Sequence, residues 1–90
     1  MEEALQIRRQ MVESDPDNNV LWQALADAML AGYTLKYLQK DIEAAAALAA
    51  SAYEITSKFV RLYPENESYA LKHRIAGDSV EKCKRGLEKQ

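Results

Sequence analysis

Residues 15–30, DPDNNVLWQALADAML, contain the signals that decide the fold of this chain. Pro16 cannot continue a helix from the preceding segment, because its ring removes an amide donor and disfavours the helical region for Asp15. Asp17 or Asn18 can cap a new helix directly afterwards. The apolar positions that follow are Leu21, Ala24, Leu25, Ala28 and Met29, with Trp22, Ala26 and Leu30 on the adjacent face. The stretch therefore predicts a turn and then a helix that packs on two sides.

The composition of the whole chain favours the same class of fold. Ninety residues suffice for one domain, 1–90, with a single small core. Apolar residues make up 48% and charged residues 29%, which is a globular rather than a disordered balance. Three glycines and two prolines are too few for the turns of a β-sandwich. We therefore expect an all-α bundle of three or four antiparallel helices.

The positions of Pro and Gly divide the chain into segments. The predicted helices are Glu2–Glu13, Asn19–Ala31 and Leu35–Tyr63, followed by a last segment that starts at Asn66 or Ser68. Gly32 is expected to end the second helix in a left-handed conformation, and Thr34 to cap the next one. The last segment is predicted as one helix through Gly77, with two short helices broken there as the alternative.

The Leu35–Tyr63 helix is expected to be the long central element. One apolar stripe comprises Leu48, Ala52, Ile55, Phe59 and Leu62, and a second comprises Ile42, Ala46, Ala49, Tyr53, Val60 and Tyr63. A helix with two such stripes must be covered from two sides. In the last segment a single stripe runs through Tyr69, His73, Ala76, Val80, Cys83 and Leu87.

Charge and cysteine usage limit the partners and the compartment. The net charge of −2 argues against a nucleic-acid-binding protein, which needs a basic surface. A single cysteine excludes an internal disulfide and suits a reducing compartment. Residues 1–10 have acids where a signal peptide has bases, and the longest apolar run, Ala44–Ala50, is too short to span a membrane. We therefore expect a cytoplasmic protein without a membrane segment.

No combination of residues indicates catalysis or metal binding. One histidine and one cysteine cannot supply the roughly four ligands of a structural zinc site. His73 and Cys83 are about 15 Å apart along one predicted helix, too far for a nucleophile–base pair. Phosphate-binding glycine loops and serine elbow motifs are absent from the sequence. The sequence predicts a non-enzyme with no cofactor and no metal.

The Trp22, Leu25, Ala26 and Met29 spacing after the Pro16 junction resembles the first helix of a tetratricopeptide repeat. Further matching positions are Ala4, Met11 and Pro16, and again Ala52, Phe59 and Pro64. The two prolines are 48 residues apart, whereas the family period is 34. Arg8 and Thr56 also stand where an aromatic residue is usual. The likeness therefore covers about half the chain, and a plain helix bundle is the alternative.

The resemblance implies a helical hairpin that binds a protein or peptide on its first-type helix. Gln23, Asp27, Leu30 and Ala31 would line that groove. Family members that bind chaperones clamp a C-terminal carboxylate with a basic residue and an Asn, and these places hold Gln23 and Asp27 here. An anionic peptide terminus is therefore not expected at that groove.

Aromatic placement adds to this interpretation, because Tyr and Trp are enriched at interface hot spots. Tyr33 and Tyr37 are one turn apart, and Trp22 can belong either to the core or to an interface. The residues predicted to bind a partner are Trp22, Gln23, Asp27, Leu30, Tyr33 and Tyr37. The predicted function is a protein–protein interaction module that binds a protein or peptide, as a monomer or a homodimer. An engineered binder would show the same economy of Gly and Pro.

The alternative function is DNA binding through residues 28–42. Ala28, Gly32, Thr34 and Leu38 have helix-turn-helix spacing. Lys36, Tyr37, Gln39 and Lys40 would then face DNA.

Overall fold

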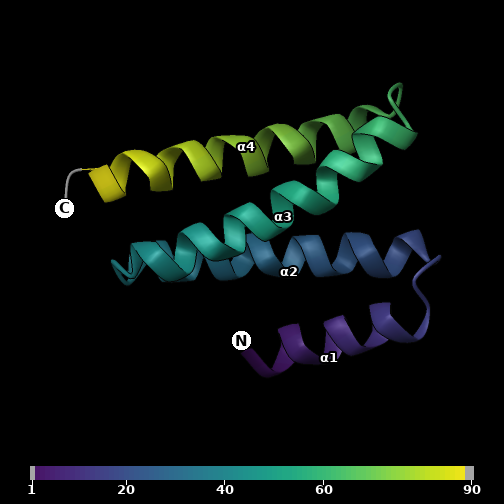
Figure 1. Cartoon of the computed structure of the whole chain (residues 1–90), viewed down its shortest axis with the longest axis horizontal. Helices are drawn as coiled ribbons and strands as arrows, with labels where there is room; N and C mark the ends of the chain where they lie inside the picture. The colour runs from purple at the N-terminus through teal and green to yellow at the C-terminus, as the bar shows by residue number, and fades with distance from the viewer. Residues whose placement is uncertain (1, 89–90) are drawn as a thin grey trace.

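The computed structural model describes the backbone of residues 2–88 and the side chains of residues 5–88, and it is all-α (Figure 1). Its helices are α1 (Glu2–Ser14), α2 (Asn19–Leu38), α3 (Ile42–Leu62) and α4 (Glu67–Glu88). Within residues 2–88 there is no strand. The predicted all-α class is confirmed, and of the three or four antiparallel helices expected, residues 2–88 contain four.

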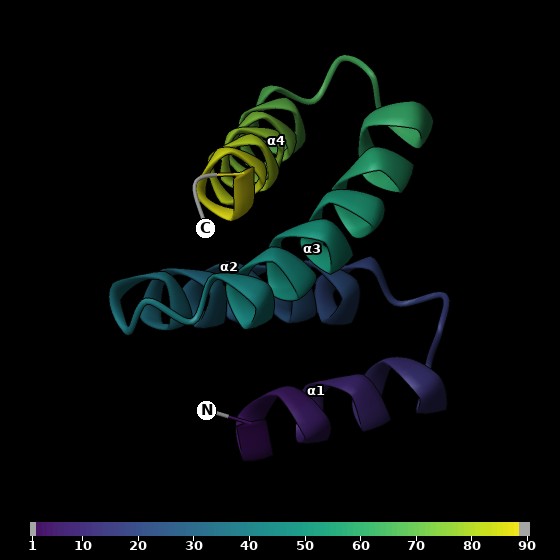
Figure 2. The same ribbon diagram turned by 60° about the vertical axis from the view of Figure 1, so that its left-hand side comes forward.

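Consecutive helices run in opposite directions and lie side by side (Figures 1 and 2). α3 packs against both α2 and α4, which confirms its predicted central position. α1 packs against α2, and α2 approaches α4 only over a short stretch. The Cα trace measures 39 × 31 × 14 Å, so the helices form a thin array rather than a bundle closed around one axis.

The predicted boundary between the second and third helices is wrong. α2 continues through Gly32, which is buried within it, and ends at Leu38. Thr34 does not cap a helix; its hydroxyl donates to the carbonyl of Leu30 one turn earlier. The predicted Leu35–Tyr63 helix is therefore divided between two helices. Residues 35–38 belong to α2, and α3 begins at Ile42.

A Schellman motif built without glycine makes this break. Lys40 adopts φ 65, the left-handed conformation usual for Gly. Its amide donates to the carbonyl of Tyr37, and the amide of Asp41 donates to the carbonyl of Lys36. The Asp41 carboxylate then accepts from the amide of Ala44 and caps α3. The turn is therefore formed by the polar residues 39–41. Of these, only Asp41 is of a type that indicates a helix N-cap from the sequence.

The other two connections follow the predicted turn signals. Asn18 caps α2 by accepting from the amide of Val20 at 3.0 Å. Asn66 caps α4 by accepting from the amide of Tyr69 at 3.1 Å. α4 continues through Gly77, as predicted, so the alternative of two short helices is excluded.

The core consists mainly of small and aliphatic side chains in two clusters. The larger cluster contains Leu5, Val12, Leu25, Ala26, Met29, Ala52, Ile55, Phe59 and Ala76. The smaller contains Tyr33, Ala45, Ala49 and Cys83. Ala45, Ala49 and Ala52 are 0% exposed, so the Ala-rich half of α3 allows neighbouring helices to approach closely. Leu62 was expected in the apolar stripe of α3 but is 66% exposed, because the C-terminal end of α3 extends beyond the helices that pack against it.

Candidate interaction groove

The residues predicted to bind a partner lie along α2, and most of them face α4. The side-chain amide of Gln23 donates to the hydroxyl of Tyr69 at 2.6 Å. Asp27 pairs with Lys72 at 3.2 Å. Leu30 is partly buried against the larger core cluster. Two residues of the groove implied by the tetratricopeptide resemblance, Gln23 and Asp27, are therefore engaged by α4.

The two tyrosines are part of the same α2–α4 contact. Tyr33 is 9% exposed and belongs to the smaller core cluster. Tyr37 packs beside it, with ring centroids 5.8 Å apart, and the ammonium of Lys82 lies 4.7 Å from the Tyr37 ring centroid. These rings stabilise the junction between α2 and α4 and offer little free surface.

Trp22 differs from the other predicted residues because it lines an open groove. The groove has a volume of about 500 Å³ and lies between the α1–α2 loop, the start of α2 and the last turns of α3. Its apolar surface comes from Pro16, Trp22, Ile55, Phe59 and Leu62, and its polar surface from Asp17, Asn19, Lys58 and Arg61. Trp22 also packs against the larger core cluster, which is the first of the two roles considered for it from the sequence.

Contacts to neighbouring residues hold the groove in shape. The indole N–H of Trp22 donates to the carbonyl of Pro16 at 2.7 Å, which fixes the ring against the loop. The side-chain amide of Asn19 donates to the Tyr63 hydroxyl at 3.0 Å and so joins the start of α2 to the end of α3. The Phe59 ring stacks on Tyr69 with centroids 5.1 Å apart. A groove formed before binding loses less conformational entropy when a ligand enters.

The rim of the groove is charged unevenly. Lys58 and Arg61 are three residues apart on α3, and the Lys58 ammonium lies 5.4 Å from the Trp22 ring centroid. Asp17 lies on the loop side. Among residues 5–88 the one ion pair joins Lys72 and Asp27, so neither rim cation has a carboxylate within 4.0 Å in that range. Within the described residues, the α3 wall is therefore cationic and has no ion-pair partner.

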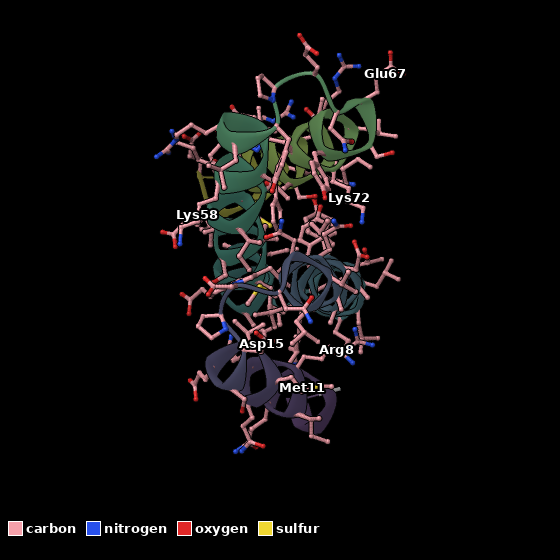
Figure 3. All side chains as sticks on the ribbon, turned by 90° about the vertical axis from the view of Figure 1, so that its right-hand side faces the viewer. Arg8, Met11, Asp15, Lys58, Glu67 and Lys72 are labelled. Atoms are coloured by element: carbon pink, nitrogen blue, oxygen red, sulfur yellow. The ribbon has the colours of Figure 1, made fainter. Side chains whose placement is uncertain are left out.

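The groove and the α2–α4 face point in different directions. Viewed end-on in Figure 3, Lys58 projects from one side of the molecule and Lys72 from the other. The α3 wall of the groove and the Lys72 side of the α2–α4 contact are therefore separate surfaces.

Sequence reasoning identified Trp22 but missed the α3 wall of this groove. The available signal was the i, i+3, i+4 set of Lys58, Arg61 and Leu62 just before Pro64, where a helix ends. Leu62 was assigned to the buried stripe because periodicity cannot tell where a neighbouring helix stops.

The two reactive side chains are used structurally. Cys83 is 0% exposed; burial raises the pKa of its thiol, and the nearby Lys82 charge offsets part of that effect. A protonated thiol is a poor nucleophile. His73 Nδ1 and the Thr56 hydroxyl are 2.9 Å apart, and the His73 ring stacks on Tyr53. In the described part of the chain, no three His, Cys, Asp or Glu residues are grouped as metal ligands would be.

The geometry expected for DNA binding through residues 28–42 is not present as predicted. Residues 28–38 are continuous helix, and the turn lies at residues 39–41. Tyr37 is engaged by Lys82, and Lys36 lies at a separate hollow beside Leu5 and Leu48. None of the helices in residues 2–88 is long and apolar enough to cross a membrane.

Comparisons with protein-family models, with curated proteins and with solved structures found no match for this chain.

Proposed function

We propose that this protein is a non-enzymatic interaction module that binds a protein or peptide in the groove beside Trp22. The observation that carries the proposal is the combination of an exposed Leu62 with a partly buried Trp22 in one pre-shaped hollow. Tryptophan is among the side chains most enriched at interface hot spots, where a few residues supply most of the binding energy. Its volume is within the range of about 300–1,000 Å³ typical of ligand pockets.

The tetratricopeptide resemblance supports protein or peptide binding as the kind of activity. It directs attention to the α2 face with Gln23, Asp27 and Leu30, whereas the open surface is at the Trp22 groove. The proposal therefore keeps the predicted function and moves its centre from the α2–α4 face to the α2–α3 groove.

Selection from a random twelve-residue peptide library on the full chain tests the proposal. Trp22 is the only tryptophan, so its fluorescence reports binding in the groove directly. We expect selected peptides without tryptophan to shift this emission, with dissociation constants of about 10–100 μM for a groove of this size.

A matched pair of variants controls the selection. Leu62→Gln replaces the apolar side chain by a polar, uncharged one and should abolish binding. Because Leu62 is exposed, this replacement should leave the fold intact. Leu38→Gln makes the same change at another exposed leucine, at the end of α2, and should bind normally. A library that yields no binders, or binders equally affected by both substitutions, would contradict the proposed function.

A further inference from the structure

We infer that the occupant of the Trp22 groove is an acidic peptide segment, in which a bulky apolar side chain is flanked by carboxylates. This inference rests on the proposed function and adds the chemistry of the partner. The apolar side chain fills the hollow between Trp22 and Leu62, and the carboxylates face the α3 wall.

The charge of the α3 wall carries the inference. Lys58 and Arg61 line the same groove. Among residues 5–88, no carboxylate lies within 4.0 Å of the charged nitrogens of either side chain. Within a groove with low-dielectric walls, unpaired cations attract an anionic ligand and disfavour a cationic one. The guanidinium of Arg61 can also hold a carboxylate through two parallel hydrogen bonds.

The position of Lys58 sets the register between the two kinds of contact. Its ammonium lies over the Trp22 ring at 5.4 Å, so a carboxylate bound to it must adjoin the apolar side chain that covers the indole. Asp17 on the opposite rim disfavours acidic residues on the loop side. The groove therefore favours carboxylates on one flank of the apolar anchor, the flank along α3.

The protein as a whole gives no general attraction for acids. The chain has 14 acidic and 12 basic residues and a net charge of −2. A preference for an acidic peptide is consequently opposed by the overall charge and must come from local groups. This makes the preference diagnostic of the groove.

Three ten-residue synthetic peptides test the inference by titration of Trp22 fluorescence in the full chain. All three contain a leucine–phenylalanine pair, and they differ in four residues on one side of this pair, which are glutamate, glutamine or lysine. At low salt we expect the glutamate peptide to bind about tenfold more tightly than the lysine peptide. The difference should shrink as salt screens the rim charges.

Two double variants with identical charge change serve as test and control. Lys58→Glu with Arg61→Glu should reverse the order of the glutamate and lysine peptides. Lys84→Glu with Arg85→Glu alters exposed residues near the C-terminal end of α4, at the opposite end of the molecule from the α1–α2 loop (Figure 1), and should preserve the order. Circular dichroism of each variant confirms that the helices remain.

The outcomes separate this inference from the function on which it rests. Equal binding of the three peptides, tighter binding of the lysine peptide, or the same loss in both double variants would overturn the acidic preference. If library selection still gives peptides that respond to Leu62→Gln, the interaction function stands and only the partner chemistry is wrong. If no peptide in either experiment changes Trp22 emission, both proposals fail.

Discussion

At the residue scale, Phe59 belongs both to the groove and to the core. It is 5% exposed, belongs to the larger core cluster and stacks on Tyr69, yet it also lines the groove. Leu62, one turn later on α3, lines the same groove at 66% exposure. Substitutions at Phe59 and at Leu62 can therefore test the stability of the fold and binding in the groove separately.

Phe59→Ala is expected to lower the free energy of unfolding by about 3–5 kcal/mol, because it removes a buried ring and leaves a cavity. Leu62→Ala should change it by no more than about 0.5 kcal/mol, as at other exposed positions. Urea denaturation of both variants measures the difference. A near-neutral Phe59→Ala would show that α3 does not pack as described.

Cys83 gives a second prediction at the same scale. Its thiol is fully buried, so reaction with a dithiobis-nitrobenzoate reagent requires α4 to separate from α2 and α3. We expect the native chain to react at least about 100-fold more slowly than the chain unfolded in denaturant. Equal rates would contradict the burial of this side chain.

The raised pKa of Cys83 also fixes the sign of a pH effect. The folded state holds the thiol proton more tightly than the unfolded state. This contribution to stability is present below the ordinary pKa of 9.0 and is lost as the pH rises through the raised folded-state value. The stability of Cys83→Ala should consequently fall less steeply than that of the wild type in this alkaline range, as urea denaturation at several pH values can measure.

At the element scale, the α2–α3 turn shows what sequence patterns do and do not determine. Pro16 and Pro64 located two turns correctly because proline cannot continue a helix. The third turn was placed at Gly32, since Gly is the usual left-handed residue at helix ends. In the structure Gly32 is buried inside α2, and Lys40 takes the left-handed position.

The same limit explains which part of the candidate site was found. Trp22 was predicted from residue type and junction, and both are local signals. The α3 wall with Lys58 and Leu62 depends on how far α3 extends past the start of α2, which is set by tertiary packing. The α4 contacts of Gln23 and Asp27 were equally invisible, because no local pattern specifies a partner helix more than 40 residues away.

Lys40→Gly tests the turn. A non-glycine residue at φ 65 is strained, so glycine should raise the free energy of unfolding by about 0.5–1 kcal/mol. Gln39→Gly is the matched control: φ is −78 there, and the substitution should destabilise by a similar amount. Thermal denaturation followed by circular dichroism resolves both signs. Destabilisation by Lys40→Gly would argue against a Schellman motif at this position.

At the scale of the whole molecule, the helices differ in how many neighbours cover them. α3 packs between α2 and α4, whereas α1 packs against α2 at one edge of the array. Ile7 and Met11 on α1 are accordingly 51% and 47% exposed. The array is least covered at α1 and most covered at α3.

Hydrogen exchange should follow this order. We expect amides of residues 5–14 in α1 to exchange faster than those in the middle of α3, because opening α1 exposes less buried surface. Mass spectrometry of peptic fragments gives the comparison. Equal protection of α1 and α3 would mean that the four helices unfold only as one unit.

The binding role is tested most directly by amide chemical shifts of the full chain, titrated with the tightest peptide from the library selection. We predict that the largest changes in chemical shift cluster at Trp22, Lys58 and Leu62, which line the groove. The α2–α4 face, marked by Asp27 and Tyr37, should change little. Changes centred on Asp27, Leu30 and Tyr37 would instead place the partner on the face suggested by the tetratricopeptide resemblance and would contradict the assignment of the groove.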